Sequence, residues 1–166
     1  MGSEMCIRDR TLRPLPLSVF RFASTLRFAS FGGCCLPNID GAPVLLLPWL
    51  MHLVLYDVSV SKVDIECLLA GCIVLEALQI QGIHGFSALR IVSESVRMIS
   101  LSCWWNSRSL EVFHDFLIER APCLDKLIVL YPAGPTIVRI VDAPKLTVLG
   151  YAAVSYTHLT LPTTSR

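Results

Sequence analysis

The chain is poor in charged residues. Lys, Arg, Asp and Glu make up 16% of its 166 residues, and 54% of the residues are apolar. Soluble domains carry about 25% charged residues on average, so this composition favours an ordered, heavily buried chain and argues against a disordered one. The formal net charge is +1 and no block of basic residues is present, so we expect no nucleic-acid partner.

A long apolar run is missing too. The longest uncharged stretch of the N-terminal half, residues 41–56, contains two prolines and is shorter than the roughly 20 apolar residues of a membrane-spanning helix. The first residues include Arg8, Asp9 and Arg10 and lack the apolar core of a signal peptide. We therefore expect no membrane partner and a cytoplasmic or nuclear location.

Sequence motifs for catalysis and for metal binding are absent. The chain contains no G-x-x-x-x-G-K phosphate loop, no G-x-S-x-G elbow and no H-E-x-x-H pair, so we expect neither an enzyme nor a bound cofactor. Its seven cysteines include no C-x-x-C pair, which argues against a zinc site and favours reduced, mostly buried thiols. The adjacent residues Cys34 and Cys35 leave a redox couple open as an alternative.

What the sequence does contain is one apolar pattern repeated along the chain. Residues 75–80 follow the pattern L-x-x-L-x-L, and four other segments follow it with similar apolar residues: 50–55, 96–101, 124–129 and 146–151. The copies begin at positions 50, 75, 96, 124 and 146, which are 25, 21, 28 and 22 residues apart. Steps of this size with this pattern indicate leucine-rich repeats. Such units stack into a solenoid, because no unit can bury its apolar face alone.

The unit that begins at residue 50 is predicted to contain a helix. A strand over residues 50–56 is followed by Ser61, which is a suitable helix N-cap, and Gly71 is suited to end the helix. Ile65 and Leu68 fall on one face of this helix. No G-x-G-x-x-G loop joins the strand to the helix, which excludes a dinucleotide-binding unit.

The later units are predicted to lack a helix. Three short segments with apolar first and last residues, 89–91, 116–118 and 138–140, end only five or six residues before the next copy of the pattern. That spacing is too short for a helix, so we predict a strand, a tight turn and a second strand in each of these units. The predicted fold class is α/β, a leucine-rich-repeat solenoid that is irregular and β-rich toward the C-terminus.

The predicted repeat domain covers residues 25–153 and is expected to be a fragment of a longer protein. It begins with a degenerate copy of the pattern at residues 26–31. Residues 11–24 contain two prolines and are predicted to be irregular. The two ends, residues 1–10 and 154–166, resemble translated sequencing adapters that recur at the termini of unrelated predicted proteins, and we treat them as artefact.

The side chains that alternate with the repeated apolar residues predict a partner-binding surface. Successive side chains of a strand point to opposite faces of the sheet, so these residues are expected to line its outer, concave face. The predicted partner-binding residues are His52, Val54, Tyr56, Gln79, Gln81, Met98, Ser100, Lys126 and Ile128. Only Lys126 among them is charged, which favours a neutral or apolar protein partner.

Some polar and aromatic residues have ordinary structural explanations beside functional ones. Asp64 and Glu66 are expected to form a solvated face of the predicted helix, and His84 is expected to lie in a loop flanked by glycines. Trp104 and Trp105 either fill the core and cover a loop or anchor a partner, since tryptophan is enriched at binding hot spots.

Several of these segments resemble the leucine-rich-repeat region of plant F-box proteins of the kind that carries an FBD domain. The resemblance lies in residues 26–34, 53–61, 68–76, 117–127 and 143–151, within about residues 20–153. It implies that the chain is the substrate-recognition part of an F-box subunit of a cullin-RING ubiquitin ligase. The implied partner is a protein target to be ubiquitinated.

The residues that carry this resemblance are repeats, and we find no F-box among the 166 residues. In the family an F-box binds the Skp-type adaptor of the ligase. That adaptor is therefore expected as a partner only through an F-box that is not present in these residues. Two alternatives stay open: a stand-alone repeat scaffold or truncated, non-functional product, and a small-molecule sensor.

Overall fold

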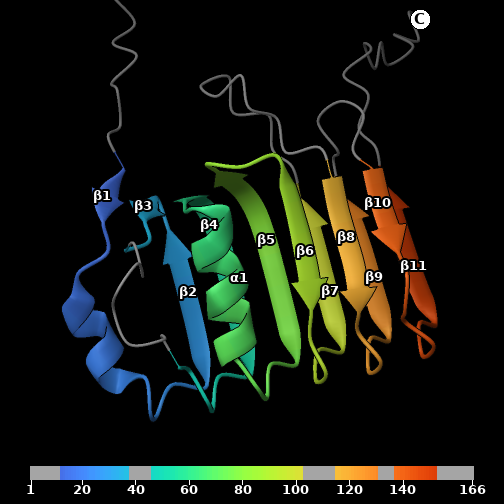
Figure 1. Cartoon of the computed structure of the whole chain (residues 1–166), viewed down its shortest axis with the longest axis horizontal. Coiled ribbons are helices and arrows are strands. Elements are labelled where there is room, and N and C mark those ends of the chain that lie inside the picture. Colours follow the sequence, from blue (N-terminus) through green and yellow to red (C-terminus); the bar gives the residue numbers. More distant parts are fainter. Residues whose placement is uncertain (1–11, 38–45, 103–114, 131–136, 153–166) are drawn as a thin grey trace, which may run out of the picture.

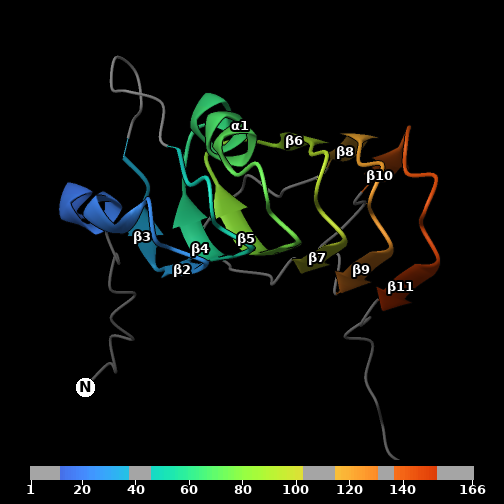
Figure 2. The same cartoon turned by 90° about the horizontal axis from the view of Figure 1, so that it is seen from below.

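The computed structural model describes residues 12–37, 46–102, 115–130 and 137–152 of the chain. Its elements form two layers that face each other (Figure 1). Figure 2 shows that the strands of a larger sheet make one layer, and that α1 (Lys62–Gly71) makes the other layer together with a smaller sheet. The architecture is therefore α/β, and strand dominates the described residues.

Eight strands form the larger sheet, and all of their pairings are parallel. The strands are β1 (Arg13–Pro14), β2 (Phe28–Gly32), β3 (Cys34–Cys35), β4 (His52–Ser59), β5 (Ala77–His84), β7 (Met98–Ser102), β9 (Lys126–Leu130) and β11 (Val148–Ala152). They follow the order β1-β3-β4-β5-β7-β9-β11, and β2 also pairs with β4. Each copy of the apolar pattern supplies one strand, from β2 in the degenerate copy to β11, so the predicted strands are confirmed.

The smaller sheet holds the second strand of each later unit. It consists of β6 (Ala88–Val92), β8 (Asp115–Arg120) and β10 (Ile137–Ile140), paired in parallel in that order. Short turns join β6 to β7, β8 to β9 and β10 to β11 (Figure 1). The predicted strand, turn and strand are therefore confirmed in all three units.

Local capping sets the limits of α1. The backbone N–H of Asp64 donates to Ser61 Oγ at 3.1 Å, so Ser61 is the N-cap as predicted, and the helix ends at Gly71. The Ser61 hydroxyl also bonds to the Asp64 carboxylate, which leaves Asp64 only 4% exposed. The expectation of a solvated Asp64 is therefore wrong, because the cap holds its side chain against the helix end. No helix among the described residues is long and apolar enough to cross a membrane.

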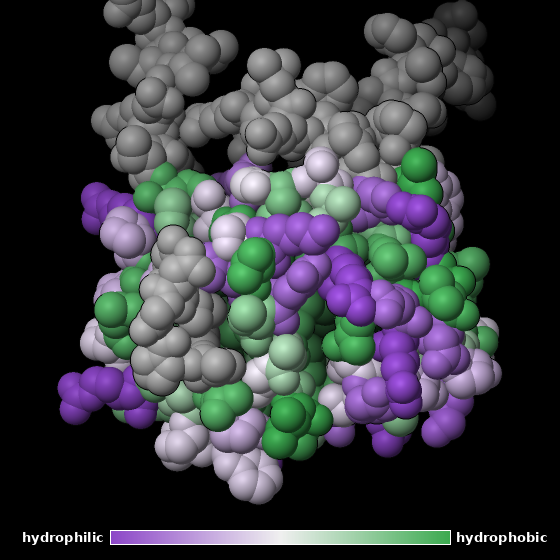
Figure 3. Space-filling model, viewed as in Figure 1, coloured by the Kyte–Doolittle hydropathy of each residue, from purple (hydrophilic) through white to green (hydrophobic). Residues whose placement is uncertain are grey.

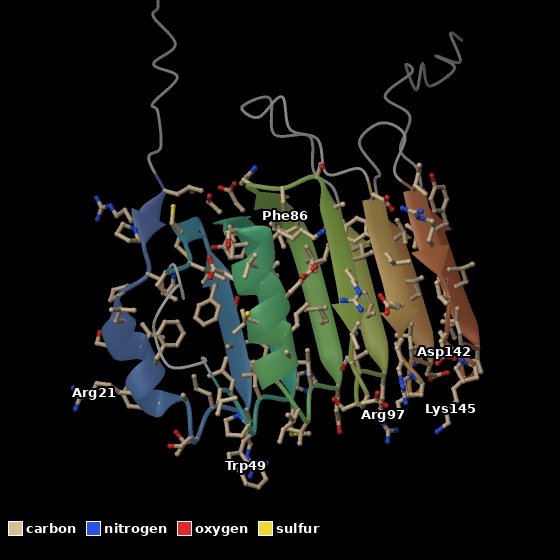
Figure 4. The ribbon with its side chains drawn as sticks, viewed as in Figure 1. Arg21, Trp49, Phe86, Arg97, Asp142 and Lys145 are labelled. Carbon is tan, nitrogen blue, oxygen red and sulfur yellow. The ribbon has the colours of Figure 1, made fainter. Side chains whose placement is uncertain are left out.

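A regular set of backbone hydrogen bonds holds the units in register. The carbonyl of Met51 accepts the N–H of Glu76 at 2.8 Å and that of Ala77 at 3.0 Å. The carbonyls that accept two such bonds from the next unit are those of Arg27, Met51, Glu76, Arg97 and Asp125. These residues lie where the strands of the larger sheet begin, at the edge where Figure 4 labels Arg97 and Lys145. Every unit therefore starts its strand at the same level.

The core lies between the two layers. The repeated apolar residues of the copies at 50–55, 75–80, 96–101 and 124–129 are at most 3% exposed. The facing layer contributes Ile65 and Leu68 of α1, and further residues from β6 and β8: Leu89, Ile91, Phe116 and Ile118. Burying one such side chain contributes about 1.5–3 kcal/mol, so the repeated pattern supplies a large share of the stabilising burial, and the facing layer adds to it.

The segment predicted to be irregular has short regular elements. Residues 11–24 include β1 and the 3-10 helix η1 (Leu17–Phe22), whose N-cap is Pro16. A proline at a helix start loses no hydrogen bond, because the first N–H groups of a helix have no partner within it. The rings of Phe20 and Phe31 are 6.5 Å apart, so η1 packs on β2. The prediction of an irregular segment is therefore wrong for these residues.

Candidate protein-interaction surface

The outer face of the larger sheet carries the predicted partner-binding residues in aligned rows. Parallel pairing of β4, β5, β7 and β9 sets three rows across the sheet: His52-Ala77-Met98-Lys126, Val54-Gln79-Ser100-Ile128 and Tyr56-Gln81-Ser102-Leu130. On β4, β5 and β9 these residues alternate with the buried ones, whereas on β7 Ser100 and Ser102 are buried as well. The structure therefore brings all nine predicted residues to one face. Their role in binding stays a prediction.

Most of these side chains are accessible to solvent. The exposed or partly exposed ones are His52, Val54, Tyr56, Gln79, Gln81, Met98, Lys126 and Ile128. Ser100 differs from the prediction, since it is only 9% exposed. It has a short side chain and is paired with Gln79 and Ile128 on the adjacent strands, whose longer side chains flank it. Ser100 therefore offers a partner little surface.

The sequence analysis missed one residue of this face. Phe28 on β2 pairs with His52, and it is 59% exposed. The centroids of the Phe28 and His52 rings are 6.4 Å apart, so the two rings extend the first row by one strand. The degenerate copy at residues 26–31 contained this signal, because position 28 corresponds to His52 in the next copy.

A glycine positions the aromatic ring of Tyr56. A Cβ atom added to Gly32 would lie only 1.8 Å from Tyr56 Cε1, so the ring lies directly over this glycine of the adjacent strand. Tyr56 is 49% exposed. Any larger residue at position 32 would displace the ring, which makes Gly32 a positioning residue for this part of the surface.

The carboxyl ends of the first strands share a kink. Gly33, Asp57 and Gly82 follow a paired row of residues and have positive φ values of 61°, 51° and 71°. Beyond the kink, His84 Nε2 lies 2.8 Å from Asp57 Oδ1. His84 is the last residue of β5, so the expectation that it lies in a loop is wrong. Its contact with Asp57 joins β4 and β5 at this edge.

The opposite face of the molecule is charged. Arg90 on β6 pairs with Glu119 on β8, and Arg139 on β10 pairs with Asp115 on β8. Figure 3 shows hydrophilic residues across the layer of β6, β8 and β10. The hydrogen bond from Arg90 lowers the pKa of the Glu119 carboxyl and raises that of the guanidinium. The two outer faces thus differ in charge: one is nearly neutral, and the other carries ion pairs across β6, β8 and β10.

The described cysteines are free thiols: Cys34, Cys35, Cys67, Cys72 and Cys123. Burial raises the pKa of the Cys72 thiol to about 12, and burial followed by the neighbouring Cys35 raises the pKa of Cys34. Thiols with raised pKa values are poor nucleophiles at neutral pH, which disfavours the redox couple. Within the described ranges, no group of three or more His, Cys, Asp or Glu residues is placed to hold a metal ion. Trp104 and Trp105 lie outside the described residues.

The stacked parallel strands and the open face across them define a class of repeat protein suited to protein interaction. The family model described as "FBD-associated F-box protein At5g56370, LRR repeats" matches residues 4–165. The chain therefore belongs to this family of leucine-rich-repeat regions, and the resemblance noted in the sequence is confirmed. The comparisons with curated proteins and with solved structures found no match.

The family match extends beyond the predicted repeat domain. It includes most of residues 1–10 and 154–166, which we interpret as artefact. Both segments lie outside the described residues. The limits of the repeat domain therefore stay predictions.

Proposed function

We propose that this chain is the substrate-recognition part of an F-box subunit of a cullin-RING ubiquitin ligase. Its units stack as a segment of a solenoid, and the outer face of the larger sheet holds the target protein. The chain performs no chemistry of its own and needs no cofactor. Its place of action is the cytoplasm or the nucleus, and the Skp-type adaptor is bound by an F-box and not by these repeats.

One observation carries this proposal beyond the family match. The outer face of the larger sheet is a continuous set of rows from β2 to β9, and it combines exposed aromatic and amide side chains with little charge. Phe28 and Tyr56 are 59% and 49% exposed, and aromatic residues are enriched among the residues that dominate binding energy. A target with an apolar, hydrogen-bonding surface fits this face.

A photo-crosslinking experiment tests the proposal. A photoreactive phenylalanine analogue replaces Gln79 at the centre of the face, and in a matched control it replaces Leu117 on the outer face of β8. Both variants are expressed in cells within the full-length protein that carries these repeats. We expect a specific adduct from position 79, and ubiquitination of the crosslinked protein by the reconstituted ligase. Equal adducts from both positions would contradict the proposed face, and an adduct that is never ubiquitinated would contradict the ligase role.

A further inference from the structure

A groove separates α1 from β6 in the layer opposite the proposed target-binding face. It has a volume of about 440 Å³, within the range of roughly 300–1,000 Å³ that is usual for small-ligand sites. It lies where the layer changes from a helix to strands, because a helix and a strand project their side chains differently. Figure 3 looks onto this layer. We call it the α1–β6 groove.

The two walls of the α1–β6 groove come from regular positions. Glu66, Leu69 and Ala70 line one wall at helical spacing, and Ile73 continues it just beyond the end of α1. Arg90 and Val92 line the other wall from alternate positions of β6. Ile73 is 66% exposed and Val92 is 40% exposed. The groove therefore presents apolar surface on both walls that nothing in the described chain covers.

Two of the charged side chains that line the α1–β6 groove already have partners. Arg90 donates to Glu119 through Nε and Nη2, the latter at 2.7 Å from Oε1. Glu94 lies 2.9 Å from the Arg120 guanidinium. These ion pairs leave neither an unpaired cation for an anionic ligand nor an unpaired carboxylate at Glu94.

Glu66 is the exception. Its carboxylate interacts electrostatically with Arg90, but Arg90 donates its hydrogen bonds to Glu119. Glu66 Oε1 is buried and has no hydrogen-bond donor among the described residues. A buried carboxylate oxygen without a donor is unfavourable by more than an ordinary unmade hydrogen bond. The terminal torsion of a glutamate is soft, so a small rotation turns this oxygen toward a donor in the groove.

We propose that the α1–β6 groove binds an ammonium or guanidinium group on an aliphatic stem, the chemistry of a lysine or arginine side chain. The cationic group donates to the Glu66 carboxylate, and the stem packs on Ile73 and Val92. Long basic side chains bury such stems along apolar surface while their charged ends stay hydrogen-bonded. The α1–β6 groove is in the other layer, so binding of the cationic group there is independent of the proposed target-binding face.

A binding titration of the whole chain tests this site. The probes are blocked lysine, blocked arginine and blocked norleucine, which keeps the stem without the charge, and the readout is the amide NMR shift of Ala70 and Ile73. We expect both cationic probes to bind, and norleucine to bind at least about tenfold more weakly, because a charge-assisted hydrogen bond contributes that much. Equal binding of norleucine would overturn the proposal.

Two variants and a matched control locate the site. Glu66→Gln is nearly isosteric and is expected to weaken the binding of blocked lysine about tenfold, while Glu76→Gln, outside the groove, leaves it unchanged. Ile73→Ser alters an exposed residue, so the fold is kept, and it is expected to weaken binding severalfold. Unchanged affinity in Glu66→Gln would contradict the proposal whether or not the target-binding face functions.

The source of the cation is settled by a further pair of probes. Hexylammonium is compared with a lysine-containing peptide. Equal affinities support a small-amine site, and tighter binding of the peptide supports a site for a protein side chain. Failure of both probes to bind would overturn the proposed chemistry.

Discussion

Two copies of the same apolar pattern have opposite surroundings in this molecule. Leu127 on β9 is fully buried, whereas Leu149 on β11, paired directly with it, is 66% exposed. The next apolar position behaves in the same way, since Val129 is 3% exposed and Tyr151 is 65% exposed. The pattern thus decides which way a side chain points, while burial also requires stacked units on both sides.

Truncation of the two leucines gives the largest expected effect. Leu127→Ala removes methyl groups from a packed core and is expected to lower the free energy of unfolding by about 2–5 kcal/mol. Leu149→Ala removes a side chain that is mostly in water and is expected to cost less than about 1 kcal/mol. Urea denaturation of both variants measures the difference. Equal losses would show that β11 is as well packed as β9, contrary to the structure.

The stability of the protein is also expected to depend on pH through the Cys72 thiol. Burial raises the pKa of Cys72 from 9.0 to about 12, so the unfolded chain releases this proton at a lower pH than the folded chain. The contribution of the protonated Cys72 thiol to the free energy of unfolding is fully present below pH 9. It is lost as the pH rises toward 12, by up to about 1.4 kcal/mol for each pH unit. Denaturation curves between roughly pH 8 and roughly pH 11 test this dependence.

The control for this titration is Cys72→Ala. The substitution lowers stability at every pH because it leaves a cavity, but it removes the proton release of Cys72. Its stability is therefore expected to fall less steeply with pH than that of the unsubstituted protein. Parallel pH profiles of the two proteins would show that the Cys72 thiol ionises as readily in the folded state as in the unfolded one.

Substitutions on the outer face of the larger sheet test whether its side chains serve binding, in contrast to the side chains that point into the core. Tyr56→Ala combined with Gln79→Ala is expected to weaken target binding at least about tenfold, with little change in the melting temperature. Val148→Ala on β11 is the matched control, because it lies at the edge of the same face and is expected to leave binding unchanged. Unaltered affinity in the double variant would count against the outer face of the larger sheet as the binding surface.

Ion pairs on the charged layer give the smallest expected effect. Glu119→Gln removes the hydrogen-bonded partner of Arg90, but both side chains are well exposed to solvent. Exposed ion pairs contribute little and are screened by salt. We expect no measurable shift of the urea midpoint at physiological salt. A large shift would show that this layer depends on its charges as much as on its core.

Features that depend on local period and pattern were predictable from the sequence. The strands, the N-cap Ser61 and the end of α1 at Gly71 all depend on residues close together in the chain. The rows across the sheet were also predictable, because copies of one pattern align in register when they stack. The family resemblance was visible in the same segments.

Features that depend on contacts between distant segments were missed. Ser100 is buried by its flanking strands, and Tyr56 is positioned by Gly32 from the preceding unit. The α1–β6 groove was also missed, because Glu66 was interpreted as a solvated helix residue. Whether that carboxylate meets a donor depends on how far β6 lies from α1, which no local pattern encodes.

The backbone hydrogen bonds at the start of each strand have a consequence for how such a chain can diversify. One carbonyl per unit, such as that of Met51 or Arg97, sets the level of the next strand. The steps between copies vary from 21 to 28 residues, yet the strands stay aligned. Insertions and deletions elsewhere in a unit therefore leave neighbouring units in place. The loops can change in length and sequence while the strands of the sheet stay aligned.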